Sequence, residues 1–214
     1  MRSADATTLV RTALAILVVY LIIVKFPVAA TILLIAVVIA LDGLDGYFAV
    51  REESRGRISF SAYLKSALGD NEAKAKVRKV KESIKKSAPH GARMDVAGDR
   101  VVEYSLWIVF TYLHVLPIYV ILIVLVRHSF VDALMASKGT SSRMKTGFAS
   151  KIYSSNIARG GINVVKFLTF SYLALVYVSG YPIIFGYILT GILVAYILLR
   201  GAAEVYESMN ERRG

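Results

Sequence analysis

Residues 28–50 have the sequence VAATILLIAVVIALDGLDGYFAV, which is apolar from 28 to 41 except for Thr31. As a helix, this stretch is long enough to cross a lipid bilayer. Its last third nevertheless carries Asp42 and Asp45. Charged side chains are costly in lipid and normally face protein or water. The stretch therefore predicts a transmembrane helix with one end lining a hydrated space.

The rest of the chain repeats this pattern of long apolar stretches with polar ends. Apolar residues make up 56% of the 214 residues, the mean hydropathy is +0.58 and the formal net charge is +11. There is no Cys, which excludes disulfides and Cys-based metal sites. We expect one all-α integral membrane domain over 1–214, with six transmembrane helices around a polar cavity. The predicted spans lie near 8–26, 28–50, 94–114, 117–137, 160–179 and 181–203.

The distribution of Lys and Arg predicts the orientation in the membrane. The N-terminus, 51–93, 127–160 and the C-terminus are placed on one side by six spans. That side then carries every Lys and Arg except Lys25, if Lys166 is assigned to the nearer end of its span. Basic loops remain in the cytoplasm. We therefore expect a protein of the cytoplasmic membrane with both termini and the cavity on the cytoplasmic side.

A second pair of carboxylates begins the third span. Asp95 and Asp99 are four residues apart, and Asp42 and Asp45 are three apart, so each pair shares a helix face. At a rise of ~1.5 Å per residue, Asp42 lies roughly 12 Å inside its span, and Asp99 lies somewhat shallower. Four such carboxylates predict a site for Mg²⁺ or Mn²⁺. The alternative is ion pairing inside the bundle, with Arg93 and Arg100 as the nearest candidates in sequence.

The stretches Asp42-Gly-Leu-Asp-Gly-Tyr-Phe-Ala49 and Gly91-Ala-Arg-Met-Asp-Val-Ala-Gly-Asp99 together resemble the CDP-alcohol phosphotransferase signature. That signature is D-x-x-D-G-x-x-A-R, a short spacer, and G-x-x-x-D-x-x-x-D. The resemblance extends over essentially the whole chain, since six spans also fit this family. Two departures are visible: Val50 separates Ala49 from Arg51, and the spacer is lengthened to 52–90. Asp5, Thr8 and Arg11 are similar to the N-x-x-T-x-x-R of some members, with Asp replacing Asn.

The resemblance implies an enzyme of phospholipid biosynthesis with a two-metal site. Asp42, Asp45 and Asp95 would bind one ion, and Asp42, Asp95 and Asp99 the other, with Asp99 also the catalytic base. The partners implied are a CDP-linked lipid donor of diacyl or archaeal ether type, an acceptor alcohol, the bilayer and a second copy of the chain. No nucleic-acid partner is expected. The donor would contact Asp5, Thr8, Gly46, Ala49, Arg51 and Gly91.

Basic residues outside the motif are candidates for binding the acceptor. Ser142-Arg-Met-Lys-Thr146 resembles the G-K-x-K-T stretch of phosphatidylglycerophosphate synthases. Fixed cations suit a phosphorylated acceptor, which favours inositol phosphate or glycerol phosphate over serine. Ordinary positive-inside topology would place the same residues here, so both explanations remain open. The candidate acceptor residues are Lys138, Arg143, Lys145, Arg159 and Arg200.

The insert at 52–90 is expected to be cytoplasmic, basic and helical. Ala73, Val77, Val80 and Ile84 recur at helical spacing among many Lys and Arg, and Asp70 or Asn71 could cap the helix. Such a helix could lie on an anionic leaflet or pack on its neighbour.

Several other polar and aromatic residues in or near the predicted spans are expected to have structural roles. Glu103 is expected to pair with a basic residue, His128 and Asp132 to solvate a helix end, and Trp107 and Tyr181 to be core or interfacial anchors.

A cation transporter would also place acidic residues in spans, but nearer the membrane midplane. A catalytically inactive lipid-binding scaffold is the other alternative, suggested by the basic insert and the displaced Arg51.

Overall fold

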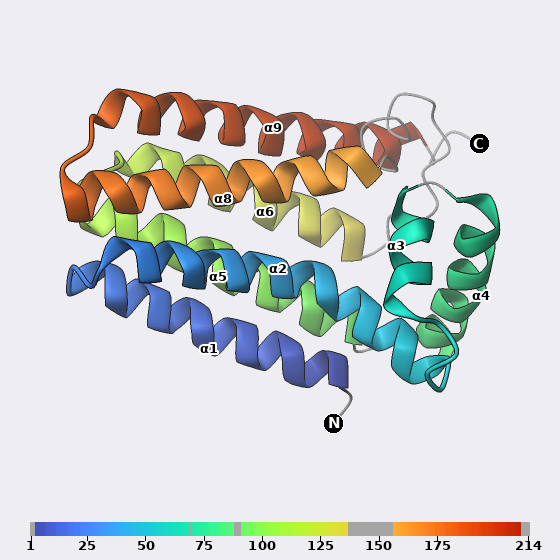
Figure 1. The fold of residues 1–214 in the computed structure, drawn as a ribbon. Coiled ribbons are helices and arrows are strands. Elements are labelled where there is room, and N and C mark those ends of the chain that lie inside the picture. The colour runs from blue at the N-terminus through green and yellow to red at the C-terminus, as the bar shows by residue number, and fades with distance from the viewer. Residues whose placement is uncertain (1–2, 69, 88–90, 137–155, 211–214) are drawn as a thin grey trace. The chain divides into compact units, whose positions relative to one another are not determined.

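The computed structural model describes residues 3–68, 70–87, 91–136 and 156–210. Within these ranges the chain is helical with short turns and contains no strand, which confirms the predicted all-α class (Figure 1). A helix covers most of each of the six predicted spans, and Pro27, Pro117 and Pro182 each directly precede one. The helices are α1 Ser3–Ile23, α2 Val28–Glu53, α3 Phe60–Leu68, α4 Asn71–Ser87, α5 Gly91–Tyr112, α6 Ile118–Ala136, α8 Asn156–Ser179 and α9 Ile183–Asn210.

Four helices in the described part of the chain are long and apolar enough to cross a membrane. They are Ala6–Ile23, Val28–Glu53, Gly160–Ser179 and Ile183–Tyr206. Large apolar side chains project outward from them, as at Leu33, which is 66% exposed. Together these features indicate a membrane protein. The helices α5 and α6 are not among the four, and the first half of α5 carries two carboxylates and two arginines that make it polar.

The chain forms two compact units, Met1–Leu106 and Trp107–Gly214, with α5 running through the boundary. In the first unit, α1 and α2 lie side by side (Figure 1). Their connecting turn is closed by Lys25 in a left-handed conformation (φ 52°), with Phe26 N donating to Leu21 O at 2.9 Å. Because the turn is this short, the two spans must be neighbours.

The insert folds as two helices, α3 and α4, packed on the last turns of α2. The predicted helix and cap are both present, since Ala73 N donates to Asp70 Oδ1 at 2.9 Å. The apolar stripe of α4 is covered by protein, because Val77 is buried with Val50 of α2 and Ile58. This burial favours the packed alternative over a helix with its apolar face in lipid. The separate helix α3 has no counterpart in the predicted pattern.

In the second unit, aromatic rings join α5 to α8. The ring centroids of Trp107 and Phe170 lie 5.0 Å apart in a T-shaped arrangement, and both side chains are buried. Trp107 is therefore a core residue. Tyr181 is 52% exposed and forms an edge contact with Tyr172 at 6.5 Å.

Candidate functional site

The first unit gathers three of the four predicted carboxylates around one arginine. Arg11 of α1 is 2% exposed, and its Nη1 forms an ion pair with Asp42 of α2. Its Nη2 donates to Asp99 Oδ1 of α5 at 2.6 Å and lies 3.9 Å from Asp95 Oδ1. Asp42 and Asp99 are thus brought to one point although 57 positions separate them in the sequence. The two halves of the motif are therefore adjacent.

The carboxylates in this cluster remain open on one side. Their side chains are 32% exposed at Asp42, 53% at Asp95 and 37% at Asp99, whereas the guanidinium beneath them is buried. A ligand can therefore reach the carboxylates without displacing α1. Of Asp45, only the helical backbone position in α2 is described.

Close contact between α1 and α5 positions Arg11. A Cβ added at Gly98 would lie 2.3 Å from Thr8 Cγ2 and 3.4 Å from Arg11 Nη2, so only glycine fits here. Thr8 is buried, and its carbonyl accepts a hydrogen bond from Thr12 Oγ1 at 2.8 Å. The structure thus gives Thr8 a packing contact with α5. Asp5, another expected donor contact, belongs to α1, but its side chain is not described.

The arginine that the structure places among the carboxylates, Arg11, was not one of the nearest ion-pair candidates in sequence. Arg100 lies 3.8 Å from Glu103 Oε2 and forms an ion pair with it. That contact confirms the expected basic partner of Glu103, which is 3% exposed. The side chain of Arg93 lies outside the described residues. Arg11 is distant in sequence, and only the arrangement of α1 beside α2 brings it to the carboxylates.

The carboxylate oxygens in the cluster are suitable ligands for a hard cation, although the guanidinium of an arginine lies among them. Carboxylate oxygens from α2 and α5 converge on one positive group, and such oxygens are the ligands preferred by Mg²⁺ and Mn²⁺. Among the side chains that the structure describes, no group of three or more His, Cys, Asp or Glu is arranged to hold a metal ion. The residue types suit a divalent cation, but in the observed geometry the carboxylates surround the guanidinium of Arg11.

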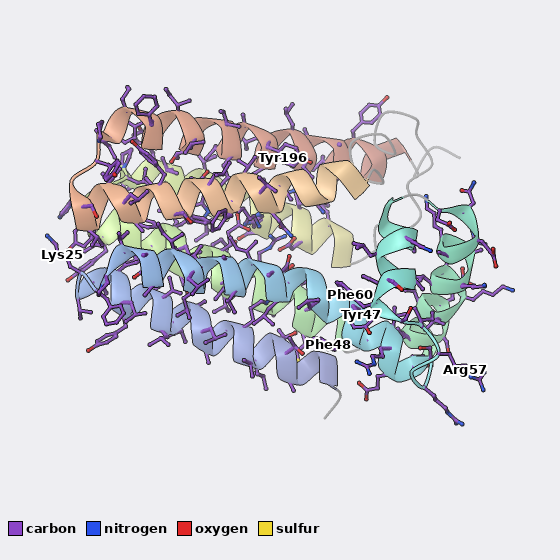
Figure 2. All side chains as sticks on the ribbon, in the orientation of Figure 1. Lys25, Tyr47, Phe48, Arg57, Phe60 and Tyr196 are labelled. Carbon is purple, nitrogen blue, oxygen red and sulfur yellow. The ribbon has the colours of Figure 1, made fainter. Side chains whose placement is uncertain are left out.

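The insert reaches the motif helix at Gly46. A Cβ at this glycine would lie 2.7 Å from the hydroxyl of Tyr63 on α3, so that hydroxyl lies against the backbone of α2. The space over Gly46 therefore borders on Tyr63. Figure 2 shows Tyr47, Phe48 and Phe60 gathered where α2 meets α3, with Tyr47 and Phe60 centroids 5.2 Å apart.

Val50, which separates Ala49 from Arg51, has a clear structural role. It is fully buried in the cluster with Ile58 and Val77, so it anchors the insert to α2. Arg51 follows it in the helix and is exposed, while Ala49 is half-buried. Ser83 Oγ also donates to Glu53 Oε1 at 2.6 Å, which fixes α4 to the same end of α2. Val50 and the insert are therefore two parts of one packed feature.

The structure describes few of the side chains that were predicted to bind the acceptor phosphate. Lys138, Arg143 and Lys145 lie outside the described residues, and Arg159 and Gly91 are placed only as backbone in α8 and α5. Arg200 is described on α9, with Nε 3.8 Å from Glu204 Oε1.

Glu204 is the centre of a second charged group, which the sequence interpretation missed. Arg127 Nη2 donates to Glu204 Oε2 at 2.9 Å, and the side chains are 8% and 5% exposed. His128 is 2% exposed, so the expectation that it solvates a helix end is wrong. Because Arg127 and Glu204 form an ion pair, α6 and α9 can each bury one charged side chain here. An unpaired charge at the same place would be destabilising. The sequence feature that indicates this charged group is an acidic residue, Glu204, near the end of an apolar span.

Gly201→Ala is expected to destabilise the second unit. The new Cβ would lie 2.6 Å from Arg127 Nε, forcing the arginine away from Glu204. Overpacking of this kind costs about 1–3 kcal/mol, which thermal unfolding in detergent would report as a lower midpoint. The control is Gly191→Ala on the same helix, where a Cβ meets nothing within 4 Å. Equal midpoints for the two variants would contradict the contact.

No protein-family model, curated protein or solved structure matches this chain.

Proposed function

We propose that this chain is a membrane enzyme that transfers a phosphatidyl-type group from a CDP-linked lipid to the hydroxyl of a phosphorylated polyol, releasing CMP. The observation that carries the proposal is the convergence of Asp42, Asp95 and Asp99 on one point. These residues occupy the positions of the CDP-alcohol phosphotransferase motif that would bind metal. Their convergence from two helices supports a functional site, because three carboxylates gather around one guanidinium, which is more acidic groups than that single positive charge balances.

The proposed topology has six spans, adding α5 and α6 to the four apolar helices. The cytoplasmic side would hold both termini, the insert and the carboxylate cluster, because nearly all Lys and Arg then lie in the cytoplasm. A donor lipid could keep its acyl or ether chains in the bilayer while its diphosphate reaches the cluster. The resemblance also supports a homodimer.

The chain's own residues would perform the transfer as follows. Asp42, Asp45 and Asp95 would hold one divalent cation, and Asp42, Asp95 and Asp99 the other. When bound, such ions neutralise charge on the diphosphate and on the departing CMP. Asp99 would accept the proton of the acceptor hydroxyl, whose oxygen then bonds to the lipid-linked phosphorus. The bond from that phosphorus to the oxygen of CMP breaks, and CMP leaves with the electron pair.

The insert would form one border of the donor site. Tyr63 lies against Gly46, one residue beyond Asp45 of the motif. Arg51 is exposed at the same end of α2 and is available to a phosphate. The mouth of the proposed site is therefore shaped by this chain's insert as well as by the motif.

The basic residues before and in α8 would hold the acceptor's phosphate. Lys145→Ala and Arg159→Ala are each expected to raise KM for the phosphorylated acceptor by about tenfold, the value of one charge-assisted hydrogen bond. The donor KM should remain unchanged. Lys76→Ala is the control, since this exposed lysine pairs with Glu72 at 2.7 Å on the insert. If both variants keep the acceptor KM of the parent, the acceptor site lies elsewhere.

The function is tested by supplying purified protein with a CDP-linked lipid, Mg²⁺ or Mn²⁺, and one acceptor at a time. Inositol phosphate, glycerol phosphate, inositol and serine form the panel. CMP release with a phosphorylated member supports the proposal in full. Release only with serine or inositol retains the reaction class and rejects the phosphorylated acceptor. Metal-dependent ion flux in proteoliposomes without CMP release would instead identify a transporter.

A further inference from the structure

The insert carries most of the excess positive charge of the chain. Residues 54–87 contain ten Lys and Arg and three acidic residues, which leaves +7 of the +11 carried by the whole chain. The helix α4 alone contains seven of these ten basic residues. Its apolar stripe is buried with Val50 and Ile58, while basic side chains such as Lys74 and Lys79 are exposed. The insert therefore presents a basic surface that the proposed reaction does not use.

The insert packs on α2 at the depth of the lipid headgroups. The hydrocarbon core of a bilayer takes about 20 residues of helix, so a span that begins at Val28 reaches the opposite headgroups near Tyr47. Val50, which packs against α4, and Glu53, which accepts from Ser83 Oγ, both lie beyond that point. Figure 1 shows α4 running across the direction of α2. The helix α4 therefore lies along the membrane surface when α2 crosses the membrane.

The helix α3 exposes two large apolar side chains close to the same depth. Phe60 and Leu64 are one turn apart and are 49% and 46% exposed, whereas the Tyr63 hydroxyl lies against Gly46 of α2. The ring centroid of Phe60 lies 5.2 Å from that of Tyr47, which places the start of α3 where the hydrocarbon core meets the headgroups. Large apolar side chains are favourable at that boundary, and basic side chains are favourable beside anionic headgroups.

We propose that the α3–α4 insert docks on the leaflet at this end of α2, with its basic residues against anionic lipid headgroups and Phe60 and Leu64 in the interface. Packing on α2 is compatible with this contact, because the apolar stripe of α4 faces protein and its basic side chains do not. An anionic leaflet matches both the charge of α4 and the apolar residues of α3 at this depth. The inference goes beyond the proposed transfer reaction and does not depend on it.

The test places one fluorescent probe on the insert, which is possible because the chain has no Cys. Ser61→Cys would carry the probe on an exposed position of α3, next to Phe60. The purified full chain would be reconstituted in bilayer discs of phosphatidylcholine and phosphatidylglycerol, with a quenching doxyl group on one lipid or on the other. We expect phosphatidylglycerol to quench more strongly than phosphatidylcholine at the same mole fraction, and added salt to reduce the difference.

Two lysines of α4 supply the variant arm. Lys74→Gln combined with Lys79→Gln should lower the enrichment of phosphatidylglycerol at the probe by at least about fivefold, the value of one basic residue near an anionic surface. Both side chains are exposed, so the fold should be unaffected. The matched control is Lys74→Arg combined with Lys79→Arg, which keeps both charges and should keep the enrichment.

A second probe position controls for general properties of the discs. Ile184→Cys lies on α9, where Ile184 is 57% exposed and no Lys or Arg occurs between 167 and 199. The two lipids should quench this probe equally. Equal quenching at Ser61→Cys would overturn the inference, as would an enrichment that the Gln variant retains. Quenching of that probe by neither lipid would also overturn it, and would indicate that the insert contacts a second copy of the chain or faces water.

Discussion

Asp99→Asn is expected to lower the rate of CMP release by about 10³-fold or more. Loss of a general base alone costs about 10²–10⁴ in rate, and an amide is also a weaker ligand for a hard cation. The fold should survive, because Asn retains the size of Asp and an oxygen that can accept from Arg11 Nη2. Initial rates with saturating donor and acceptor would measure the loss, and equilibrium binding would show that the donor is still held.

Asp70→Asn is the matched control for this result. It makes the same chemical change on the insert, where Asp70 caps α4 through the backbone N–H of Ala73. Asn also caps helices well, so activity and stability should stay near those of the parent. Turnover of Asp99→Asn within tenfold of the parent would remove Asp99 from the assigned role.

Gly98→Ala is expected to lower both stability and turnover. The added Cβ would lie 2.3 Å from Thr8 Cγ2, so α1 must move away from α5 or be distorted. Overpacking costs about 1–3 kcal/mol. Displacement of Arg11 by about 1 Å would misplace its carboxylate partners and is expected to reduce turnover about 10²-fold. Thermal unfolding and initial rates measure the two effects separately.

The clash at Gly98 has a specific rescue. Thr8→Ser removes the Cγ2 methyl with which the new Cβ collides, so the double variant should recover part of the lost stability. Thr8→Ser alone should change stability little by comparison. If the double variant is no more stable than Gly98→Ala, the collision with Thr8 is not the cause of the loss.

The parts of this fold that depend on local pattern are visible in the sequence. The apolar run before Asp42 predicts α2, the three prolines mark helix starts, and the stripe from Ala73 to Ile84 predicts α4 with its cap at Asp70. Each follows from interactions between residues a few positions apart. The spacing of Asp95 and Asp99 likewise places both on one helix face.

The contacts that define the candidate site depend on which helices become neighbours. Arg11 and Asp99 are separated by 88 positions, so no local pattern identifies them as an ion pair. Arg100 was nearer in sequence, but the i, i+3 position of Glu103 provides its partner one turn away. Tyr63 reaches Gly46 only because Val50 and Val77 pack the insert back onto α2.

The insert changes how the departure at Val50 is understood. In the sequence, Val50 separates Ala49 from Arg51, whereas the signature that this stretch resembles has Ala followed directly by Arg. In the structure, Val50 is buried beneath the α3–α4 pair and Arg51 stays exposed. The insert and Val50 therefore form one packed feature beside the motif helix.

The most direct test of the central proposal is CMP release coupled to lipid product. Purified protein would be incubated with a CDP-linked lipid, Mg²⁺ and glycerol phosphate or inositol phosphate, and both products would be quantified by mass spectrometry. We predict that CMP and a new phosphodiester lipid form in equal amounts, and that neither forms when a chelator removes the metal. Absence of both products with every acceptor in the panel, in protein that still binds Mn²⁺, would contradict it.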